Sequence, residues 1–202
     1  GAHSPAHLGV RELEHKIMNE VLMPMIKGLA EDGIPYKGIL YAGIMVTENG
    51  PKVLEFNVRL GDPETQAILP RLKSDLVELM ERSIDGDLKK IKPVWYEKSA
   101  VCVVMASGGY PGNYEKGKEI TGLDETEKLK DAIVFHAGTK RIADKYVTSG
   151  GRVLGVTGLG DDMESAISNT YKAVSGIKFE NMHFRRDIGR KALKYSLNAR
   201  LT

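Results

Sequence analysis

Apolar residues recur at helical spacing in two early parts of the chain. Across residues 10–29 they fall at three- and four-residue steps, with charged and polar side chains between them. This spacing predicts an amphipathic helix that ends near Gly33. A second stripe over residues 76–84, which stops at Asp85-Gly86, predicts another helix.

Other apolar stretches lack helical spacing and predict β-strands. Residues 38–47 are apolar on both faces, residues 51–59 alternate, and Asn49-Gly50 between them signals a β-hairpin. An apolar stripe after Asp161-Asp162 predicts a C-terminal helix. Strands outnumber helices and are joined largely by hairpins, which indicates an α+β fold with mostly antiparallel sheet. Further strands are expected at residues 100–106, 133–137 and 152–157.

A stretch between the two groups of elements breaks both patterns. Residues 87–98 contain four lysines, Pro93 and the adjacent aromatic residues Trp95 and Tyr96, so we expect a linker there. The expected division is therefore a domain at residues 1–86, a second domain at 99–195 and a tail at 196–202.

Composition and charge remove several classes of function. The 202 residues carry a net charge of +2, and basic and acidic residues are interleaved, so we expect no nucleic-acid partner. The longest apolar runs are far shorter than the roughly 20 residues of a membrane span, so we expect no membrane insertion. Cys102 is the only cysteine and lies in an apolar run, which predicts a buried thiol in a reducing compartment such as the cytoplasm. The first residues show neither an initiator Met nor a signal-peptide pattern, and we expect a fragment of a longer chain.

The second strand of the early hairpin carries a row of polar residues. Because side chains alternate along a strand, Glu55, Asn57 and Arg59 share one face. Oxygen donors from Glu and Asn suit Mg²⁺, and Arg can grip a phosphate or a carboxylate. A two-residue turn at Asn49-Gly50 places Ala42 opposite Asn57. By itself, the alternation favours an ordinary half-exposed strand over a metal site.

The residues after this strand predict the start of a helix. Asp62 is expected as N-cap, Pro63 as first helical residue and Glu64 in the first turn. A helix N-terminus beside a metal-binding strand is also a natural anion site. Both interpretations, structural and functional, account for these three residues.

Several short segments carry a resemblance to a known family. They are Gly-Ile-Leu-Tyr-Ala-Gly-Ile-Met (38–45), Val-Leu-Glu-Phe-Asn-Val-Arg-Leu-Gly-Asp-Pro-Glu-Thr-Gln (53–66), Leu-Lys-Ser-Asp-Leu (72–76), Val-Met-Ala-Ser-Gly-Gly-Tyr-Pro-Gly-Asn-Tyr (104–114), Phe-His-Ala-Gly-Thr (135–139), Gly-Gly-Arg-Val-Leu (150–154) and Arg-Arg-Asp-Ile-Gly (185–189). In this order they resemble the phosphoribosylamine–glycine ligase family of the ATP-grasp superfamily. The first five residues resemble the family's Gly-Ala-Tyr-Ser-Pro loop, with His3 in place of Tyr. The resemblance covers nearly the whole chain.

The resemblance implies a fold and an activity. The fold would be the carboxy-terminal part of an ATP-grasp catalytic domain followed by a small α/β C-terminal domain. The family uses ATP to join glycine to 5-phosphoribosylamine, through glycyl phosphate, and so forms glycinamide ribonucleotide, ADP and phosphate in purine biosynthesis.

The resemblance also implies roles for individual residues. Glu55 and Asn57 match the ligands of a Mg²⁺ or Mn²⁺ ion that bridges to the ATP phosphates. Arg59 and Asp62 match catalytic positions, and Arg59 would hold an anionic substrate group or the acyl phosphate. The implied substrate-binding residues are Ser4, Pro5, Arg59, Asp62, Glu64 and Arg152.

Two departures from the family pattern stand out. Many ATP-grasp enzymes place a further acidic ligand about 13 residues before the Glu, where this chain has Ala42. The amino-terminal half of the family's sequence should precede Gly1, so we expect the 202 residues alone to be inactive and the amino-terminal half to be a partner.

The end of the chain resembles the connector that leads, in fused eukaryotic versions, to aminoimidazole ribonucleotide synthetase.

Other interpretations stay open at this point. The chain could be another ATP-grasp carboxylate–amine ligase, although Gly61-Asp62-Pro63-Glu64 favours the first family, or a non-catalytic binding or scaffold module. His136 could face a site or simply be hydrogen-bonded at a strand end. Arg152 follows two glycines that permit close approach to a ligand, but a hairpin turn explains those glycines equally well.

Overall fold

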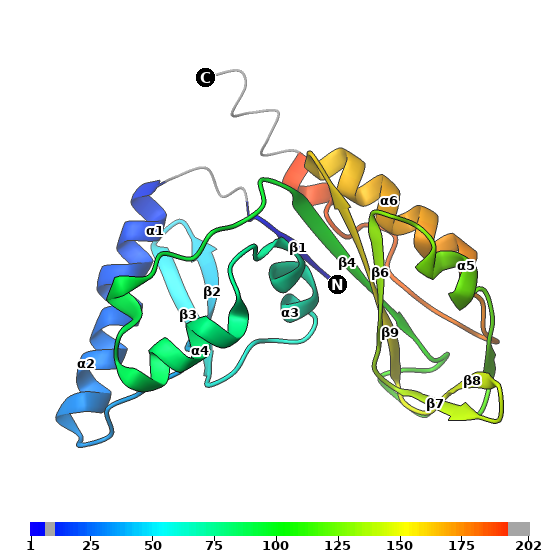
Figure 1. Ribbon diagram of the computed structural model, residues 1–202, viewed down its shortest axis with the longest axis horizontal. Coiled ribbons are helices and arrows are strands. Elements are labelled where there is room, and N and C mark those ends of the chain that lie inside the picture. The colour runs from blue at the N-terminus through cyan, green and yellow to red at the C-terminus, as the bar shows by residue number, and fades with distance from the viewer. Residues whose placement is uncertain (7–10, 194–202) are drawn as a thin grey trace. The chain divides into compact units, whose positions relative to one another are not determined.

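The computed structural model describes residues 1–6 and 11–193 of the chain (Figure 1). Contacts group these residues into two compact units. Unit 1 comprises residues 1–6, 62–71 and 96–193, and unit 2 comprises residues 11–61 and 72–95. Two early segments, residues 1–6 and 62–71, pack with the second half of the chain. The division into domains at residues 87–98 stays a prediction. The expected tail at 196–202 lies outside the described residues.

Unit 2 contains the early helix, which runs in three parts. They are α1 (Arg11–Ile17), a π-helical turn (Met18–Leu22) and α2 (Met23–Glu31). Pro24 has no N–H and clashes with the carbonyl of residue i−4 in a regular α-helix. The wider π-turn precedes this proline, and the Met23 N–H bonds to the Met18 carbonyl instead. The predicted helix is confirmed within the described residues, with its end at Glu31 just before Gly33.

Unit 2 also contains the predicted hairpin and the second helix. The hairpin pairs β2 (Tyr41–Thr47) with β3 (Gly50–Asn57). Helix α4 (Leu76–Asp85) is capped by Asp75, which accepts hydrogen bonds from two backbone N–H groups, and ends at Gly86 with φ of 74°. A left-handed glycine is the common way to end a helix, so the predicted stop at Asp85-Gly86 is confirmed. A short 3₁₀ turn follows at Leu88–Lys90.

The turn of the hairpin differs from the prediction by one residue. Glu48 and Asn49 form the turn, because Thr47 pairs with Gly50. A turn centred on Asn49-Gly50 would need a positive φ at both residues, and only Gly50 has one, at 86°. The predicted pairing of Ala42 with Asn57 is therefore wrong, and Ala42 lies opposite Phe56.

Unit 2 has almost no buried core. Gly61 is the one buried residue among those whose burial the structure describes in this unit. Large apolar side chains are open on its surface, among them Leu54 at 65%, Val58 at 71% and Ile84 at 66% exposure. The amphipathic pattern of the sequence thus forms helices and strands here without enclosing an apolar interior.

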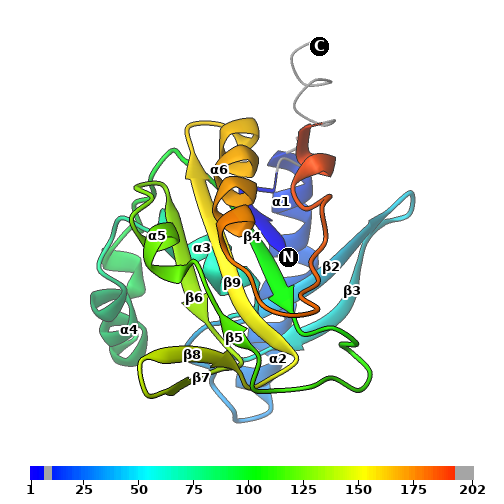
Figure 2. The same ribbon diagram turned by 90° about the vertical axis from the view of Figure 1, so that its right-hand side faces the viewer.

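Unit 1 is built on a four-stranded antiparallel sheet in the order β1-β4-β9-β6. These strands are β1 (Ala2–Ser4), β4 (Ser99–Ala106), β9 (Arg152–Gly160) and β6 (Ala132–His136). Gly158 of β9 lies against Thr170 of helix α6 (Met163–Gly176), and Gly155 lies against Gln66 of helix α3 (Glu64–Ile68). Because residues three apart in a strand face opposite sides, α6 and α3 cover opposite faces of the sheet. Figure 2 shows α6 along β9 and β4.

A smaller three-stranded sheet completes unit 1. It has the order β5-β8-β7, and the short helix α5 lies close to β6. The bounds are β5 (Glu119–Ile120), α5 (Leu123–Glu127), β7 (Thr139–Ile142), β8 (Lys145–Thr148) and a 3₁₀ turn at Leu69–Arg71. The expected α+β class with antiparallel sheet is confirmed, as are the strands predicted at 100–106, 133–137 and 152–157.

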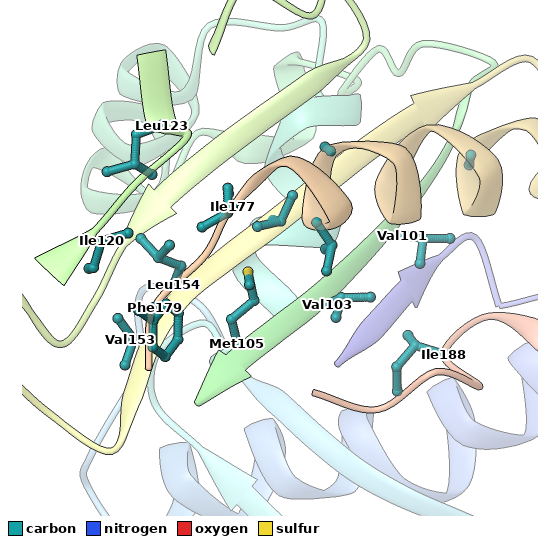
Figure 3. Packing of buried hydrophobic residues seen from close by; sticks show 14 of the residues in the cluster. Val101, Val103, Met105, Ile120, Leu123, Val153, Leu154, Ile177, Phe179 and Ile188 are labelled. Carbon is teal, nitrogen blue, oxygen red and sulfur yellow. The ribbon is translucent and has the colours of Figure 1, made fainter. Parts of the chain in front are cut away.

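The hydrophobic core of unit 1 lies between the sheet and α6. Val101, Val103 and Met105 of β4 and Val153 of β9 are fully buried in it (Figure 3). Cys102 is buried with a free thiol, as predicted from its apolar run. Helix α6 begins with a capping box in which Asp162 and Ser165 bond reciprocally, so the predicted helix start after Asp161-Asp162 is also confirmed.

Candidate functional site

The two predicted metal ligands project from the same face of β3. The side-chain amide of Asn57 donates a hydrogen bond to Glu55 Oε1 at 2.8 Å. Glu55 is exposed and Asn57 is half-buried, so both can reach a ligand in solution. The prediction that these side chains lie together is confirmed; their role as metal ligands stays a prediction.

The neighbours of this pair differ from those that the sequence predicted. Ile44 pairs with Val53 and Gly43 pairs with Glu55, so Leu54 is the extra residue of a β-bulge. The residues opposite Glu55 and Asn57 are Gly43 and Tyr41. Ala42 shares its face with Phe56 instead, so the space beside Glu55 comes from Gly43 and not from Ala42.

Arg59 does not belong to the strand. Strand β3 ends at Asn57, and Arg59 lies in the bend that follows. Its side chain is exposed, and Nη1 donates to the Leu60 carbonyl at 3.2 Å. The expected continuous row of Glu55, Asn57 and Arg59 along one strand is therefore wrong at its last member. Glu55, Asn57 and Arg59 all belong to unit 2, although Arg59 lies outside the strand.

The helix start predicted at Asp62 is also different. Helix α3 begins at Glu64, and Pro63 is its N-cap with φ of −101°, so Asp62 precedes the helix and is not its cap. The Asp62 carboxylate is engaged by side chains instead: Gln66 Nε2 donates to Oδ1 at 3.1 Å, and Arg152 Nη2 lies 3.5 Å from Oδ2. Arg152 Nη1 also donates to the Asp62 carbonyl at 2.9 Å. Asp62 and Arg152, both implied as substrate-binding residues, thus contact one another within unit 1.

The segment at Ser4 and Pro5 is fixed by pairing and by an arginine. Residues Ala2–Ser4 form edge strand β1, where the family resemblance suggested a loop. The Ser4 hydroxyl accepts a hydrogen bond from Arg71 Nη1, and Arg71 Nε donates to the Lys98 carbonyl. Burial lowers the pKa of Arg71 from its ordinary value. Arg71 therefore anchors the segment that carries Ser4 and Pro5.

Sequence reasoning did not single out Gln66 or Arg71. Gln66 stands four residues after Asp62, a spacing at which side chains on a helix approach each other. That spacing was a usable signal for Gln66. Arg71 contacts Ser4 across 67 positions, a relationship that no local pattern contains.

His136 and Glu64 have simpler surroundings. His136 Nδ1 lies 2.9 Å from Thr139 Oγ1, and its ring packs against Tyr146 at a centroid distance of 4.6 Å. These contacts support the hydrogen-bonded interpretation of His136. Glu64 is the first residue of α3 and is half-buried.

Unit 1 also has a small surface cavity that none of these residues lines. It is lined by residues 107, 108, 115, 118, 180 and 181. Lys118 pairs there with Glu115 at 2.8 Å and Glu180 at 3.0 Å. Hydrogen bonds to these carboxylates raise the pKa of Lys118, and the bond to Lys118 lowers the pKa of Glu115. The charge of the cation is already neutralised, so this cavity does not suit an anionic substrate.

The donor chemistry of Glu55 and Asn57 fits a magnesium ion. Mg²⁺ takes oxygen ligands and usually binds to one or two protein side chains, leaving its other positions to phosphates and water. Glu55 and Asn57 supply a carboxylate and an amide oxygen once the amide turns. Over residues 1–6 and 11–193, no three His, Cys, Asp or Glu residues gather into a metal-binding group. A nucleotide-bridged ion with two protein ligands therefore suits the site better than an all-protein cage.

No helix in the described part of the chain has the length and apolar character needed to cross a membrane.

Comparison with known proteins connects these residues to one family. The model of the phosphoribosylglycinamide synthetase ATP-grasp (A) domain matches residues 1–65, and that of the synthetase C domain matches residues 100–191. A phosphoribosylamine–glycine ligase from Caldanaerobacter subterraneus is 51% identical over 180 residues, which are 87% of this chain and 42% of that protein. The trifunctional purine biosynthetic protein adenosine-3 of Gallus gallus is 50% identical over 201 residues, covering 99% of this chain and 20% of that one.

A solved structure of the same family is also similar to this chain. The crystal structure of phosphoribosylamine–glycine ligase from Thermotoga maritima superposes with a TM-score of 0.79 at 35% identity, over 92% of this chain and 45% of that one. This chain thus spans less than half the length of these relatives.

Proposed function

Since this chain belongs to the phosphoribosylamine–glycine ligase family and matches the models of its ATP-grasp (A) and C domains, we propose that it supplies the metal-binding side of an ATP-dependent carbon–nitrogen ligase. The substrates are glycine, 5-phosphoribosylamine and ATP, and the reaction belongs to purine biosynthesis in the cytoplasm. The Gallus relative is a trifunctional purine biosynthetic protein, which supports fusion to further purine enzymes. The amino-terminal part of such relatives would supply the rest of the ligase.

One observation carries the proposal at the level of the site. Glu55 and Asn57 lie on one face of β3, with 2.8 Å between Asn57 Nδ2 and Glu55 Oε1, and Gly43 lies opposite Glu55. Two oxygen donors at adjacent same-face positions can bind one Mg²⁺ or Mn²⁺ ion together. When bound with ATP, such an ion neutralises the phosphate charge and aligns the γ-phosphoryl group for transfer.

The proposed reaction has two steps. First, a carboxylate oxygen of glycine attacks the γ-phosphorus of ATP, and the bond from this phosphorus to the β-phosphate oxygen breaks. ADP is the leaving group, and glycyl phosphate is the product. Second, the amine of phosphoribosylamine attacks the glycyl carbonyl, phosphate leaves, and the amine loses a proton as the amide forms.

Positioning and charge supply most of the catalysis in such transfers. We assign Arg59 to the anionic acyl phosphate, because its exposed guanidinium can grip a phosphate through two hydrogen bonds. We assign Asp62 and Arg152 to substrate binding in the reaction, with Ser4, Pro5 and Glu64 as further contacts.

Calorimetry tests the metal assignment directly. Mg²⁺-dependent ADP binding to the 202-residue chain should weaken about tenfold or more in Glu55→Gln, because the charged ligand is lost. Glu48→Gln, in the turn of the same hairpin, is the matched control and should bind like the wild type. Equal binding by wild type and Glu55→Gln would contradict the metal site.

A chimaera tests the activity. The chain joined to the amino-terminal part of the Caldanaerobacter relative should release ADP continuously only when ATP, glycine and phosphoribosylamine are all present, and Glu55→Gln should abolish this turnover. The 202 residues alone should show no turnover. Absence of turnover by a folded chimaera would overturn the proposed function.

A further inference from the structure

The carboxylate of Asp62 is held from two sides within unit 1. Gln66 Nε2 donates to Oδ1 at 3.1 Å, and the Arg152 guanidinium faces Oδ2 at 3.5 Å. Arg152 also donates to the Asp62 carbonyl at 2.9 Å, so it contacts both the backbone and the side chain of the same residue. Asp62 therefore has a defined orientation although it stands before the helix and does not cap it.

The Gln66 side-chain amide donates to Asp62, but its own oxygen has no hydrogen-bond partner. Its Oε1 is the one side-chain polar atom in the described part of the chain that is buried and has no hydrogen-bond partner. Turning the amide over would place Oε1 against the Asp62 carboxylate, where two oxygens repel each other. The contact with Asp62 thus fixes the amide in the orientation that leaves the buried oxygen unpaired.

Gln66 also lies against strand β9. The Thr157 hydroxyl donates to the Gln66 backbone carbonyl at 2.9 Å. A side chain added at Gly155 would lie 3.7 Å from Gln66 Cγ and 3.4 Å from Cys102 Sγ. A leucine at position 66 would leave no buried polar side-chain atom without a partner, so packing alone does not explain the amide.

The charges that Gln66 positions remain available to a ligand. The Asp62 and Arg152 side chains are 50% and 43% exposed, and each keeps hydrogen-bonding positions that no neighbour fills in this arrangement. A carboxylate beside a guanidinium complements a small zwitterion, whose ammonium pairs with Asp62 and whose carboxylate pairs with Arg152. Of the three proposed substrates, glycine is the zwitterion.

We propose that Gln66 is a positioning residue that orients the Asp62 carboxylate beside Arg152, and that this pair binds glycine through both of its charges. The inference rests on the proposed function, because glycine enters only as a substrate of that reaction. It goes beyond that function in giving Gln66 a role and Asp62 and Arg152 a specific ligand.

Gln66 is the only glutamine of the chain, which permits a direct test of its contact. In the 202-residue chain labelled with ¹⁵N-glutamine, the side-chain amide should give one pair of proton resonances, and Asp62→Asn should shift them. Asp124→Asn, on helix α5, should leave them unchanged. Resonances that do not respond to Asp62→Asn would overturn the positioning role.

Kinetics of the chimaera test the ligand. In Gln66→Leu, the KM for glycine should rise about tenfold, the loss expected for one charge-assisted hydrogen bond, while the KM for ATP stays within twofold. The melting temperature should equal or exceed that of the wild type, because the unpaired buried oxygen is gone. Gly155→Ala, which touches the same side chain without changing a polar group, should keep both constants.

The outcomes separate this inference from the proposed function. An active wild type in which Gln66→Leu leaves the glycine KM unchanged, or raises the glycine and ATP constants equally, would overturn the inference alone. An inactive wild-type chimaera would overturn the proposed function instead, and the labelled-amide experiment would still decide the Gln66–Asp62 contact. If Gln66→Leu does not fold, Gln66→Met provides the same loss of the amide with a more flexible side chain.

Discussion

Gly43 lies directly opposite Glu55 in the β2–β3 hairpin. A Cβ atom at position 43 would stand 3.1 Å from Glu55 Cγ, closer than an ordinary contact. The glycine therefore leaves Glu55 free to turn toward its neighbour Asn57.

Gly43→Ala should move Glu55 and weaken the proposed metal site. We expect Mg²⁺-dependent ADP affinity to fall several-fold, while the free energy of unfolding changes by less than about 1 kcal/mol because Glu55 is exposed. Calorimetry and thermal unfolding measure the two effects. Unchanged nucleotide affinity in a folded Gly43→Ala variant would mean that the Glu55 orientation does not matter for binding.

Arg71→Leu should destabilise unit 1. The change leaves the Ser4 hydroxyl and the Lys98 carbonyl without their arginine partner. Loss of hydrogen bonds to a charged group in a half-buried position costs about 1–3 kcal/mol. Thermal unfolding followed by circular dichroism measures the effect.

Arg141→Leu is the matched control for Arg71. Arg141 is 64% exposed and lies 3.6 Å from Asp144. Exposed ion pairs contribute about 0–1 kcal/mol, so this variant should unfold nearly like the wild type. Equal losses in the two variants would show that Arg71 acts only as a surface charge.

Gly158→Ala should loosen the packing of α6 on the sheet. The added methyl group would lie 2.4 Å from the Thr170 backbone nitrogen, and Gly158 is buried. Overpacking of this kind costs about 1–3 kcal/mol. The contrasting substitution is Gly28→Ala in α2, where nothing lies within 4 Å and alanine should stabilise the helix by about 0.5–1 kcal/mol. A melting temperature that rises in both variants would contradict the close approach at Gly158.

The stability of the chain should decrease at alkaline pH through Cys102. Burial raises the pKa of the Cys102 thiol, although a hydrogen bond with Thr157 lowers it in part. The folded chain therefore keeps the thiol proton to higher pH than the unfolded chain does. The free energy of unfolding should fall as the pH rises above the unfolded thiol pKa of about 8.5.

Comparison with Cys102→Ala isolates this thiol effect. Titrating groups that do not interact with Cys102 cancel in the difference between wild type and variant. Between pH 7 and 8 the difference in free energy of unfolding should be constant, and above about 8.5 the wild type should lose stability relative to the variant. Parallel curves up to pH 10.5 would show that the folded thiol is not shifted.

Local chemistry made much of the fold predictable from sequence. The end of α4 follows from Gly86, which adopts the left-handed conformation, and the start of α6 follows from the Asp162 capping box. Alternation with period two placed Glu55 and Asn57 on one face, and their 2.8 Å contact confirms it. Each of these features depends on residues within a few positions of one another.

The register of the hairpin could not be predicted from neighbouring residues alone. The sequence pair Asn49-Gly50 is compatible with two turns that differ by one residue, and the bulge at Leu54 shifts the register again. Both choices depend on how the whole hairpin packs. The prediction for Ala42 failed for this reason, although the hairpin itself was correct.

The sequence alone thus determined the main helices and strands, the end of α4, the start of α6, the family and the shared face of the two proposed metal ligands, because caps and periodicity of this kind are properties of neighbouring residues. Only the tertiary structure brought Arg152 to Asp62 across 90 positions, joined Arg71 to Ser4 and left the Gln66 oxygen buried without a partner. Such contacts form where strands and helices distant in sequence pack together, and burial decides which polar atoms keep a partner.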